Sequence, residues 1–337
     1  MRRTTCPGRA SPVTAALAVV VLLAAGCSLA GDADPAASGT APAAAATTSA
    51  AGPRGGQAAS TGPELLSAGD EPRTALRFAL TEGSISTVSV TTDVASVQGE
   101  AALARTIDPP PVTQTLRYRV GKVSGDGALV AFRVTSVAVD AAGTDLGPDQ
   151  ALTLTKALQA AEGITGSGHL SATGSFSDAR LEVPAGVPAA TRADVDALPG
   201  QIAQLQPVLP TEPVGVGGSW RSTDTATIAG VTVDQTTTYT VTAIEGSSVR
   251  YRSSFAATGH RQSLPSEGLA PGATLELVSS EASGEGRGTI DLTSLAQTAA
   301  THATATQVLT LTAPSSTPQR LGQRLELATR VRAATAG

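Results

Sequence analysis

The chain has 337 residues, of which 41% are hydrophobic, 15% are charged and only 2% are aromatic, and its formal net charge is −5. This length suffices for one large folded domain or two modest ones. The acidic balance gives a nucleic-acid partner no electrostatic support, and the scarcity of aromatic residues argues against binding by stacking on bases or sugars.

The N-terminal residues 1–26 have the features of a secretory signal peptide. Arg2, Arg3 and Arg9 precede an uncharged run, residues 13–25, that is rich in Ala, Val and Leu. The run is shorter than the roughly 20 residues that a membrane-spanning helix needs. The mature protein is therefore expected to have no transmembrane helix.

The end of that run, Leu22 to Ser28, resembles the lipobox of bacterial lipoproteins, with Ala24 where Leu is usual. The resemblance implies that Cys27 carries the lipid, palmitate included, and anchors the protein to the extracytoplasmic face of the cell membrane. The alternative is an ordinary cleavage site that contains a cysteine. If Cys27 is lipidated and Cys6 is removed with the signal peptide, no thiol remains for a disulfide, a metal or catalysis.

The segment that follows predicts a flexible linker, so that residues 27–72 form the lipidated cysteine and a disordered tether. It consists mainly of Ala, Ser, Thr, Gly and Pro and cannot bury enough apolar surface to offset its ordering entropy. A chain of about 45 such residues spans on the order of 35–40 Å. It would hold the folded part off the membrane.

Beyond Arg73, apolar and polar residues alternate with the period of half-buried strands. One predicted hairpin turns at Gly-Asp-Gly, and its inward residues are Leu116, Tyr118, Val120, Val130, Phe132 and Val134. A second hairpin turns near Glu-Gly-Ser, and its inward residues are Tyr239, Val241, Ala243, Val249 and Tyr251. Each is expected to have one apolar and one solvated face.

The two hairpins have similar neighbours. Strands are predicted upstream at 85–97 and 220–233, and glycine-spaced segments follow downstream at 166–176 and 284–290. We therefore predict two similar β units, 73–187 and 213–334, the second including a closing strand. A shared β propensity without duplication would give the same impression.

Helical spacing is scarce, and the fold class is expected to be mainly β, at the margin of α+β. One short helix is predicted at 150–161 and another at 189–205, inside a bridging segment, 188–212, that Pro199 would kink. The expected architecture is a curved antiparallel sheet or half-barrel built from two similar β units. It would enclose an apolar pocket lined by Val, Leu and Ala.

One segment stands out by its proline and glycine content just before the only tryptophan. Its marked residues are Pro210, Pro213, Gly215, Gly217 and Trp220. The prolines forbid a helix and the glycines allow close backbone approach, so a rigid lead into the second unit with the tryptophan as a core anchor is expected. Together with the lipobox, the tether and the duplicated hairpins, this segment resembles a family of bacterial surface lipoproteins known only as a domain of unknown function.

No pattern in the sequence supports catalysis or a cofactor. His169, His260 and His302 are not at metal-ligand spacing, and the common nucleophile, phosphate-binding and zinc motifs are absent from the sequence. Acidic residues such as Asp108, Asp224 and Glu245 are expected to be solvated. We predict no catalytic, cofactor-binding or metal-binding residues and hence no enzyme.

Arginines occupy the polar phase of several predicted strands, and they could bind phosphate or carboxylate groups. They are Arg117, Arg119, Arg133, Arg250, Arg252, Arg330 and Arg332. A simpler interpretation is general use of Arg in place of Lys, since Lys122 and Lys156 are the only lysines.

Three functions remain open for this lipid-anchored, extracytoplasmic protein. It could carry or sense an apolar ligand or lipid, it could be a scaffold that binds a protein or polymer of the cell envelope, or it could be a hydrolase with an unrecognised site. The first is favoured by a loose analogy of the architecture with lipid-carrying lipoproteins, in which a curved sheet encloses an apolar cavity. A hollow domain would favour the carrier, and a solid core with an exposed charged patch would favour the scaffold.

Overall fold

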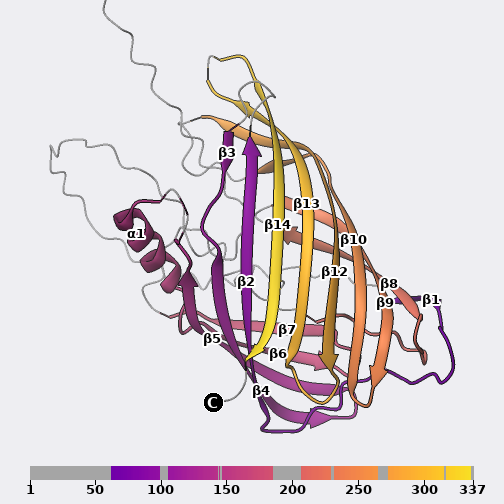
Figure 1. Ribbon diagram of the computed structural model, residues 1–337. Coiled ribbons are helices and arrows are strands. Elements are labelled where there is room, and N and C mark those ends of the chain that lie inside the picture. The colour runs from indigo at the N-terminus through magenta and orange to yellow at the C-terminus, as the bar shows by residue number, and fades with distance from the viewer. Residues whose placement is uncertain are drawn as a thin grey trace, which may run out of the picture.

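The computed structural model describes residues 62–98, 105–142, 144, 146–184, 206–228, 231–264, 272–314 and 316–334 (Figure 1). The expected signal peptide, Cys27, most of the linker and the expected helix at 189–205 lie outside this part of the chain. Among the described residues, no helix is long and apolar enough to cross a membrane.

The fold is mainly β, as predicted. Its strands are β1 (Glu64–Ser67), β2 (Ile85–Gln98), β3 (Arg105–Ile107), β4 (Val112–Ser124), β5 (Gly127–Val139), β6 (Thr165–Ser171), β7 (Phe176–Glu182), β8 (Ser219–Ile228), β9 (Val231–Glu245), β10 (Ser248–Gly259), β11 (Gln262–Leu264), β12 (Thr274–Asp291), β13 (Gln297–Thr312) and β14 (Gln319–Ala334). The helix α1 (Pro148–Gln159) precedes β6.

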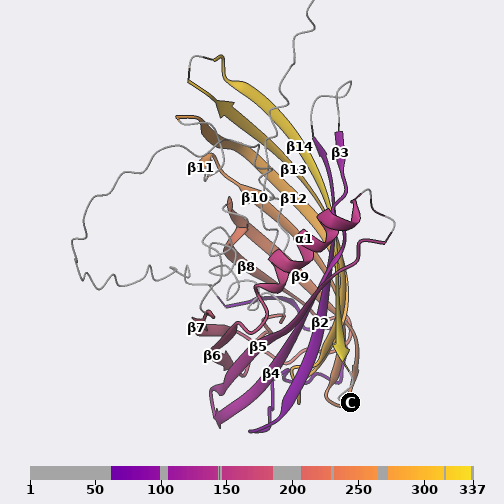
Figure 2. The same ribbon diagram turned by 90° about the vertical axis from the view of Figure 1, so that its left-hand side faces the viewer.

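All strands belong to one antiparallel sheet of 14 strands, ordered β1-β8-β9-β10-β12-β13-β14-β2-β4-β5-β6-β7, with β3 beside β2 and β11 beside β12. Each half therefore runs as a meander, and β14 joins the halves by pairing with β2 along 12 residue pairs. The sheet is strongly curved, and Figure 2 shows the strands bending around one concave side. The predicted curved antiparallel sheet is confirmed.

Two sequence expectations need correction. The strand predicted over 220–233 is divided between β8 and the beginning of β9, which pair with each other. The linker predicted through residue 72 is too long, because Glu64–Ser67 form β1 and pair with β8. An edge strand of four residues is fixed by backbone hydrogen bonds to its neighbour, so its own sequence carries little strand signal.

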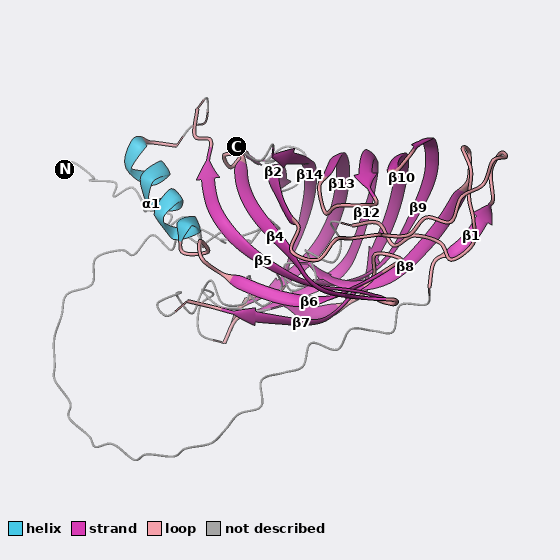
Figure 3. Cartoon of the chain, turned by 90° about the horizontal axis from the view of Figure 1, so that it is seen from below, coloured by secondary structure: helices cyan, strands magenta, loops and turns pink. Residues whose placement is uncertain are grey.

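Alternation along the strands separates a concave from a convex face. On β2 the concave residues are Val88, Val90, Thr92, Val94 and Ser96, all buried, while the residues between them are half-buried or exposed. The main apolar core lies on the concave side at the end of the sheet that carries the β6–β7 and β12–β13 turns, which we call the closed end (Figure 3). Helix α1 adds Leu158 to this core and packs against β5.

Two irregular segments cross the concave side at the closed end. In the first, the amide of Phe78 donates to the carbonyl of Ala172 at 2.8 Å, and that of Ala79 donates to Leu292 at 2.7 Å. In the second, the amide of Leu209 donates to Thr173 at 2.7 Å. These hydrogen bonds connect turns from both halves of the sheet. The buried side chains of the two segments pack against the concave face at the closed end.

The two predicted hairpins are β4–β5 and β9–β10, and their aromatic residues are on the concave face. Tyr118 lies directly opposite Phe132, whereas Tyr239 lies opposite Ser253 and Tyr251 opposite Val241. The cross-strand partners thus differ between the hairpins. A bulge between Arg250 and Tyr251 shifts the second register, so Ala243, expected to face inward, lies opposite the exposed Arg250, and Ile244, opposite Val249, packs against the core instead.

Candidate functional site

The concave face beyond the closed end forms a broad surface of small side chains, which we call the trough. Its lower border is one row across six strands: Tyr239, Ser253, Gly286, Thr301, Thr329 and Thr92. Its upper border is a second row: Ser280, Gln307 and Gln323. Between them lie Phe255, Ala257, Ala282, Gly284, Ala303, Ala305, Leu325, Leu327, Val94 and Ser96. Most of these side chains are small, and Gly284 leaves room for the Phe255 ring to lie over it.

Aromatic rings border the trough on the side of β8 to β10. The Trp220 and Tyr239 rings stack with centroids 5.4 Å apart, and Tyr239 meets Tyr251 edge-on at 5.7 Å. A Cβ atom at Gly288 would lie 2.5 Å from the Tyr251 hydroxyl oxygen, so only glycine lets this ring extend over β12. Gly166 admits the Phe132 ring in the same way in the first half.

Burial changes the titration of these tyrosines. It raises the pKa of Tyr251 to about 12 and also raises those of Tyr118 and Tyr239 well above the ordinary value. The hydroxyls therefore stay neutral over the physiological range. They contribute donors to the concave side without contributing charge.

Buried polar side chains on the concave face are incompletely paired. Gln114 is only 2% exposed, and neither its amide nitrogen nor its amide oxygen has a hydrogen-bond partner. The buried Gln323 donates from Nε2 to the Ser96 hydroxyl at 3.1 Å, but its amide oxygen has no partner. Each such group costs about 1–3 kcal/mol, so a native fold that retains it needs a reason.

A second polar group lies on the concave side of β8 and β9. The hydroxyl of Ser222 donates to the Asp224 carboxylate at 3.4 Å, and the amide of Gln235 donates to the Thr237 hydroxyl at 3.2 Å. Burial raises the pKa of Asp224, with a smaller opposing effect of the Ser222 hydrogen bond. No basic side chain pairs with this carboxylate among the described residues.

Apolar side chains gather again at and beyond the upper border of the trough. A second buried cluster consists of Val231, Val233, Ala257, Leu277 and Leu309, with Leu264, Leu275 and Leu321 packed against it. The trough is therefore polar along its two borders and mainly apolar between them. The residues between the borders are mostly Ala, Leu and Val, the types expected from the sequence, while glutamine, serine and threonine occupy inward positions along the borders.

The proline–glycine segment before the tryptophan lies at the closed end. The Pro210 carbonyl accepts a hydrogen bond from the Arg77 guanidinium at 2.7 Å, and Pro213 is exposed. The amide of Gly215 donates to Ala68 at 2.8 Å, and a Cβ here would lie 1.8 Å from the Asp70 carbonyl oxygen. This position therefore requires glycine.

The segment ends at the tryptophan. Gly217 has a φ of +77°, and Trp220 is 1% exposed. The indole nitrogen of Trp220 donates to the Val208 carbonyl at 2.8 Å. The segment thus connects β8 to the N-terminal strand and to the core of the closed end, and it contributes no side chain to the trough beyond the Trp220 ring.

The residues considered for catalysis or metal binding are scattered. Asp224 is on the concave face opposite Gln235, while Glu245 is at the far end of β9, about 30 Å further along the strand, where it pairs with Arg250. His260 and His169 each approach one exposed aspartate. Within the described part of the chain, no three His, Cys, Asp or Glu side chains are grouped as metal ligands would be.

The strand arginines share the convex face, on the other side of the sheet from the trough. The seven that the sequence singled out are all exposed, and Arg287 on β12 joins them. Arg252 lies directly opposite Arg287, and Arg117 directly opposite Arg133. Arg250 is paired with Glu245 at 2.7 Å; the others have no carboxylate partner among the described residues.

Sequence reasoning missed Gln114, Gln323 and Arg287. Gln114 could have been noticed, because it interrupts the apolar phase of its strand between Val112 and Leu116. Arg287 stands between two glycines, where the strand pattern is weak. Nothing in the local sequence marks Gln323, because its hydrogen bond to Ser96 depends on the pairing of β14 with β2.

Comparisons with known proteins leave the family open. No family model matches the sequence, and no curated protein matches it. The chain is similar to a loop L8 deletion mutant of OmpT, an outer membrane protein of Vibrio cholerae, at 7% identity over 74% of this chain and 100% of that chain, with a TM-score of 0.18.

Two further solved structures are similarly distant. In-vitro folded OmpT of Vibrio cholerae, in its trimer form, is 9% identical over 74% of this chain and 100% of that chain, with a TM-score of 0.16. An outer membrane channel from Pseudomonas putida F1 is 11% identical over 76% of this chain and 97% of that chain, with a TM-score of 0.12. At these TM-scores the similarities support no conclusion about function.

Proposed function

We propose that the protein is a lipid-anchored, extracytoplasmic and non-enzymatic binding protein that holds an amphipathic ligand, such as a lipid, in the trough. The observation that carries this proposal is the buried Gln114 amide, in the row next to the lower border of the trough on the side of the closed end, whose two polar atoms have no partner. A ligand hydroxyl at this place would accept from the amide nitrogen and donate to the amide oxygen. A buried amide that served only stability would be replaced by an apolar side chain at no cost.

The distribution of side chains supports an amphipathic ligand over a purely apolar one. The lower border of the trough presents the hydroxyls of Thr92, Thr301 and Thr329, whereas the residues between the borders and the clusters at both ends are mainly apolar. A molecule with acyl chains and a polar linkage would match both parts, because each would meet an environment of its own polarity.

The sequence supports the anchored, extracytoplasmic part of the proposal. The lipobox-like segment that ends at Cys27 follows an apolar run, and the Ala- and Ser-rich segment after it is long enough to act as a tether. An anchored binding protein needs such a tether, because the trough must face ligands away from the attachment point. Cys27→Ala is expected to move the protein from the membrane fraction to the secreted soluble fraction. Retention in membranes after a high-salt wash would contradict lipid anchoring.

Native mass spectrometry tests ligand binding directly. The full chain, purified from bacterial envelopes that contain lipids, is expected to carry a co-purifying adduct with the mass of an amphipathic molecule. Gln114→Met keeps the length of the side chain and removes both polar atoms, so the occupied fraction should fall roughly tenfold. Thr115→Val, on the convex face of the same strand, is the matched control and should retain the adduct.

The outcomes separate the parts of the proposal. A clean ligand-free mass for the wild type would overturn the binding function. An adduct that Gln114→Met and Thr115→Val both retain at the wild-type level would show that the trough position is wrong. Loss in Gln114→Met alone is the expected result.

A further inference from the structure

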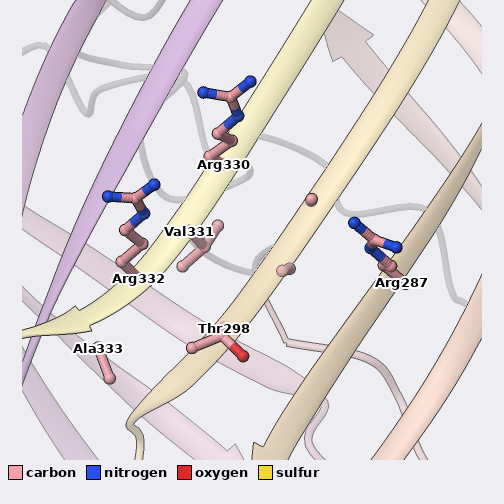
Figure 4. Close-up of a pocket in the computed structure, with 8 residues that line it drawn as sticks. Arg287, Thr298, Arg330, Val331, Arg332 and Ala333 are labelled. Atoms are coloured by element: carbon pink, nitrogen blue, oxygen red, sulfur yellow. The ribbon is translucent and has the colours of Figure 1, made fainter.

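A groove bordered by arginines runs over the convex face of β10, β12, β13 and β14. Two contiguous cavities of about 510 and 350 Å³ form it and share Arg287, Thr298 and Ala300. Figure 4 shows Arg330 and Arg332 on one strand and Arg287 on another, with a strand between them that forms the floor. The second cavity extends the groove to Arg250 and Arg252 on β10.

The register places the arginines on both walls of this groove. Ala300 on β13 lies opposite Arg287 on one side and Arg330 on the other. The two arginines are therefore separated by one strand, with about 10 Å between their backbones. Arg252 lies next to Arg287 in the same row. The small floor residue leaves room between the walls for a chain of modest width.

This arrangement does not stabilise the sheet. Like charges directly opposite each other on neighbouring strands, as in Arg252 and Arg287, repel each other. Arg252, Arg287, Arg330 and Arg332 have no hydrogen bond or ion pair to any other described residue. Five exposed guanidinium groups around one groove, four of them unpaired, form a site of complementary charge for a polyanion.

We propose that this groove binds a linear, phosphate-bearing polymer. A phosphate presents oxygens in several directions and can accept hydrogen bonds from guanidinium groups on both walls at once. A carboxylate presents two coplanar oxygens, which a single arginine satisfies. The aromatic rings of these strands point to the concave face, so the groove has no platform on which nucleic-acid bases would stack.

The shape and charge of the surrounding surface favour a narrow polymer over a membrane. Further along the same face, the convex residues include Asp93, Glu281 and Glu285. A flat anionic bilayer would meet these carboxylates as well as the arginines, and it would touch a convex sheet over a small area only. A single polymer chain would meet fewer of these carboxylates, of which Glu285, two residues from Arg287 along β12, lies nearest to the groove.

The inference is independent of ligand binding in the trough, because the groove is on the opposite face of the sheet. Its test uses the full chain with Cys27→Ala, so that lipid anchoring does not contribute. Binding of inorganic polyphosphate is measured by titration at several salt concentrations. Arg287→Gln/Arg330→Gln is compared with Arg320→Gln/Arg261→Gln, which removes the same charge from exposed positions outside the groove.

The groove variant should bind polyphosphate at least tenfold more weakly, and its slope of log affinity against log salt should fall by about two. The control variant should change affinity less than twofold, and both should keep the wild-type thermal midpoint. Equal losses in both variants, or no loss in either, would overturn the proposal.

Two further probes exclude other partners. Polygalacturonate should compete at least tenfold less well than polyphosphate. Any binding to vesicles of phosphatidylglycerol and phosphatidylcholine should be the same for the wild type and the groove variant. Equal competition by the carboxylate polymer, or vesicle binding that the groove variant abolishes, would assign the arginines to another anion.

Discussion

The concave and convex faces of the central strands are built from alternate residues of the same backbone. Unpaired polar groups are buried on the concave face and exposed on the convex face. On the concave face, Gln114 and Gln323 are buried, and atoms of their amides have no partner. On the convex face, Arg287 and Arg330 also have no partner, but they are exposed. A buried amide loses its water, whereas an exposed guanidinium keeps it.

The difference separates two kinds of functional evidence. An unpaired buried group on the concave face costs stability, so its retention indicates a ligand that compensates for it. Unpaired arginines on the outer face cost little, so only their concentration around one groove is informative. Four predictions test this contrast between the faces.

Truncation of an inward aromatic residue should have the largest effect. Tyr118→Ala removes a buried ring from the core of the closed end and should lower the free energy of unfolding by about 3–5 kcal/mol. Arg119→Ala, the next residue on the convex face, should lower it by less than about 0.5 kcal/mol. Urea unfolding of both variants measures this. Similar losses for the two would show that the faces are wrongly assigned.

Alkaline pH should lower the free energy of unfolding through the buried tyrosine Tyr251 of the concave face. In the unfolded chain Tyr251 ionises near the ordinary tyrosine pKa of 10.0, while burial raises the pKa in the folded protein to about 12. Stability from this group is therefore complete below pH 10 and is lost as the pH rises to about 12, at roughly 1.4 kcal/mol per pH unit.

Tyr251→Phe provides the control for the alkaline prediction. Unfolding free energies of this variant between pH 8 and 12 should fall by about 2–3 kcal/mol less than those of the wild type. An identical pH dependence in both proteins would mean that the Tyr251 hydroxyl is not buried.

Removal of the unpaired amide should stabilise the protein. Gln114→Met replaces both unsatisfied atoms in the ligand-free chain and should raise the free energy of unfolding by about 1–2 kcal/mol. Thr115→Val should leave it within about 0.5 kcal/mol, because its side chain is on the other face. Destabilisation by Gln114→Met would show that the amide is satisfied in the native protein.

Relief of a convex like-charge pair should have the smallest effect. Arg133→Gln removes repulsion from Arg117 directly opposite and should stabilise the sheet by about 0.2–0.5 kcal/mol at low salt. The gain should vanish in 1 M salt, where the Debye length is about 3 Å. A gain that persists at high salt would have a different origin.

Several features of the fold follow from the sequence alone. Alternation of apolar and polar residues is a local property of each strand, so it predicted β2, both hairpins and the inward face of their residues except Ala243, which the bulge in the second hairpin places opposite Arg250. Helical spacing predicted α1 to within two residues at each end. The convex position of the seven arginines followed from the same alternation, since period 2 fixes the face of a residue without knowledge of its neighbours.

Other features were decided only by the tertiary structure. The pairing of β14 with β2 joins residues more than 200 positions apart, and it brings the Gln323 amide to the Ser96 hydroxyl. The short strand β1 and the row of Arg252, Arg287 and Arg330 likewise depend on register between distant strands. Register is set by the packing of the whole sheet, so no local pattern shows which side chains become neighbours. The sequence therefore assigns residues to faces, while the assembled sheet determines which of them form a trough or a groove.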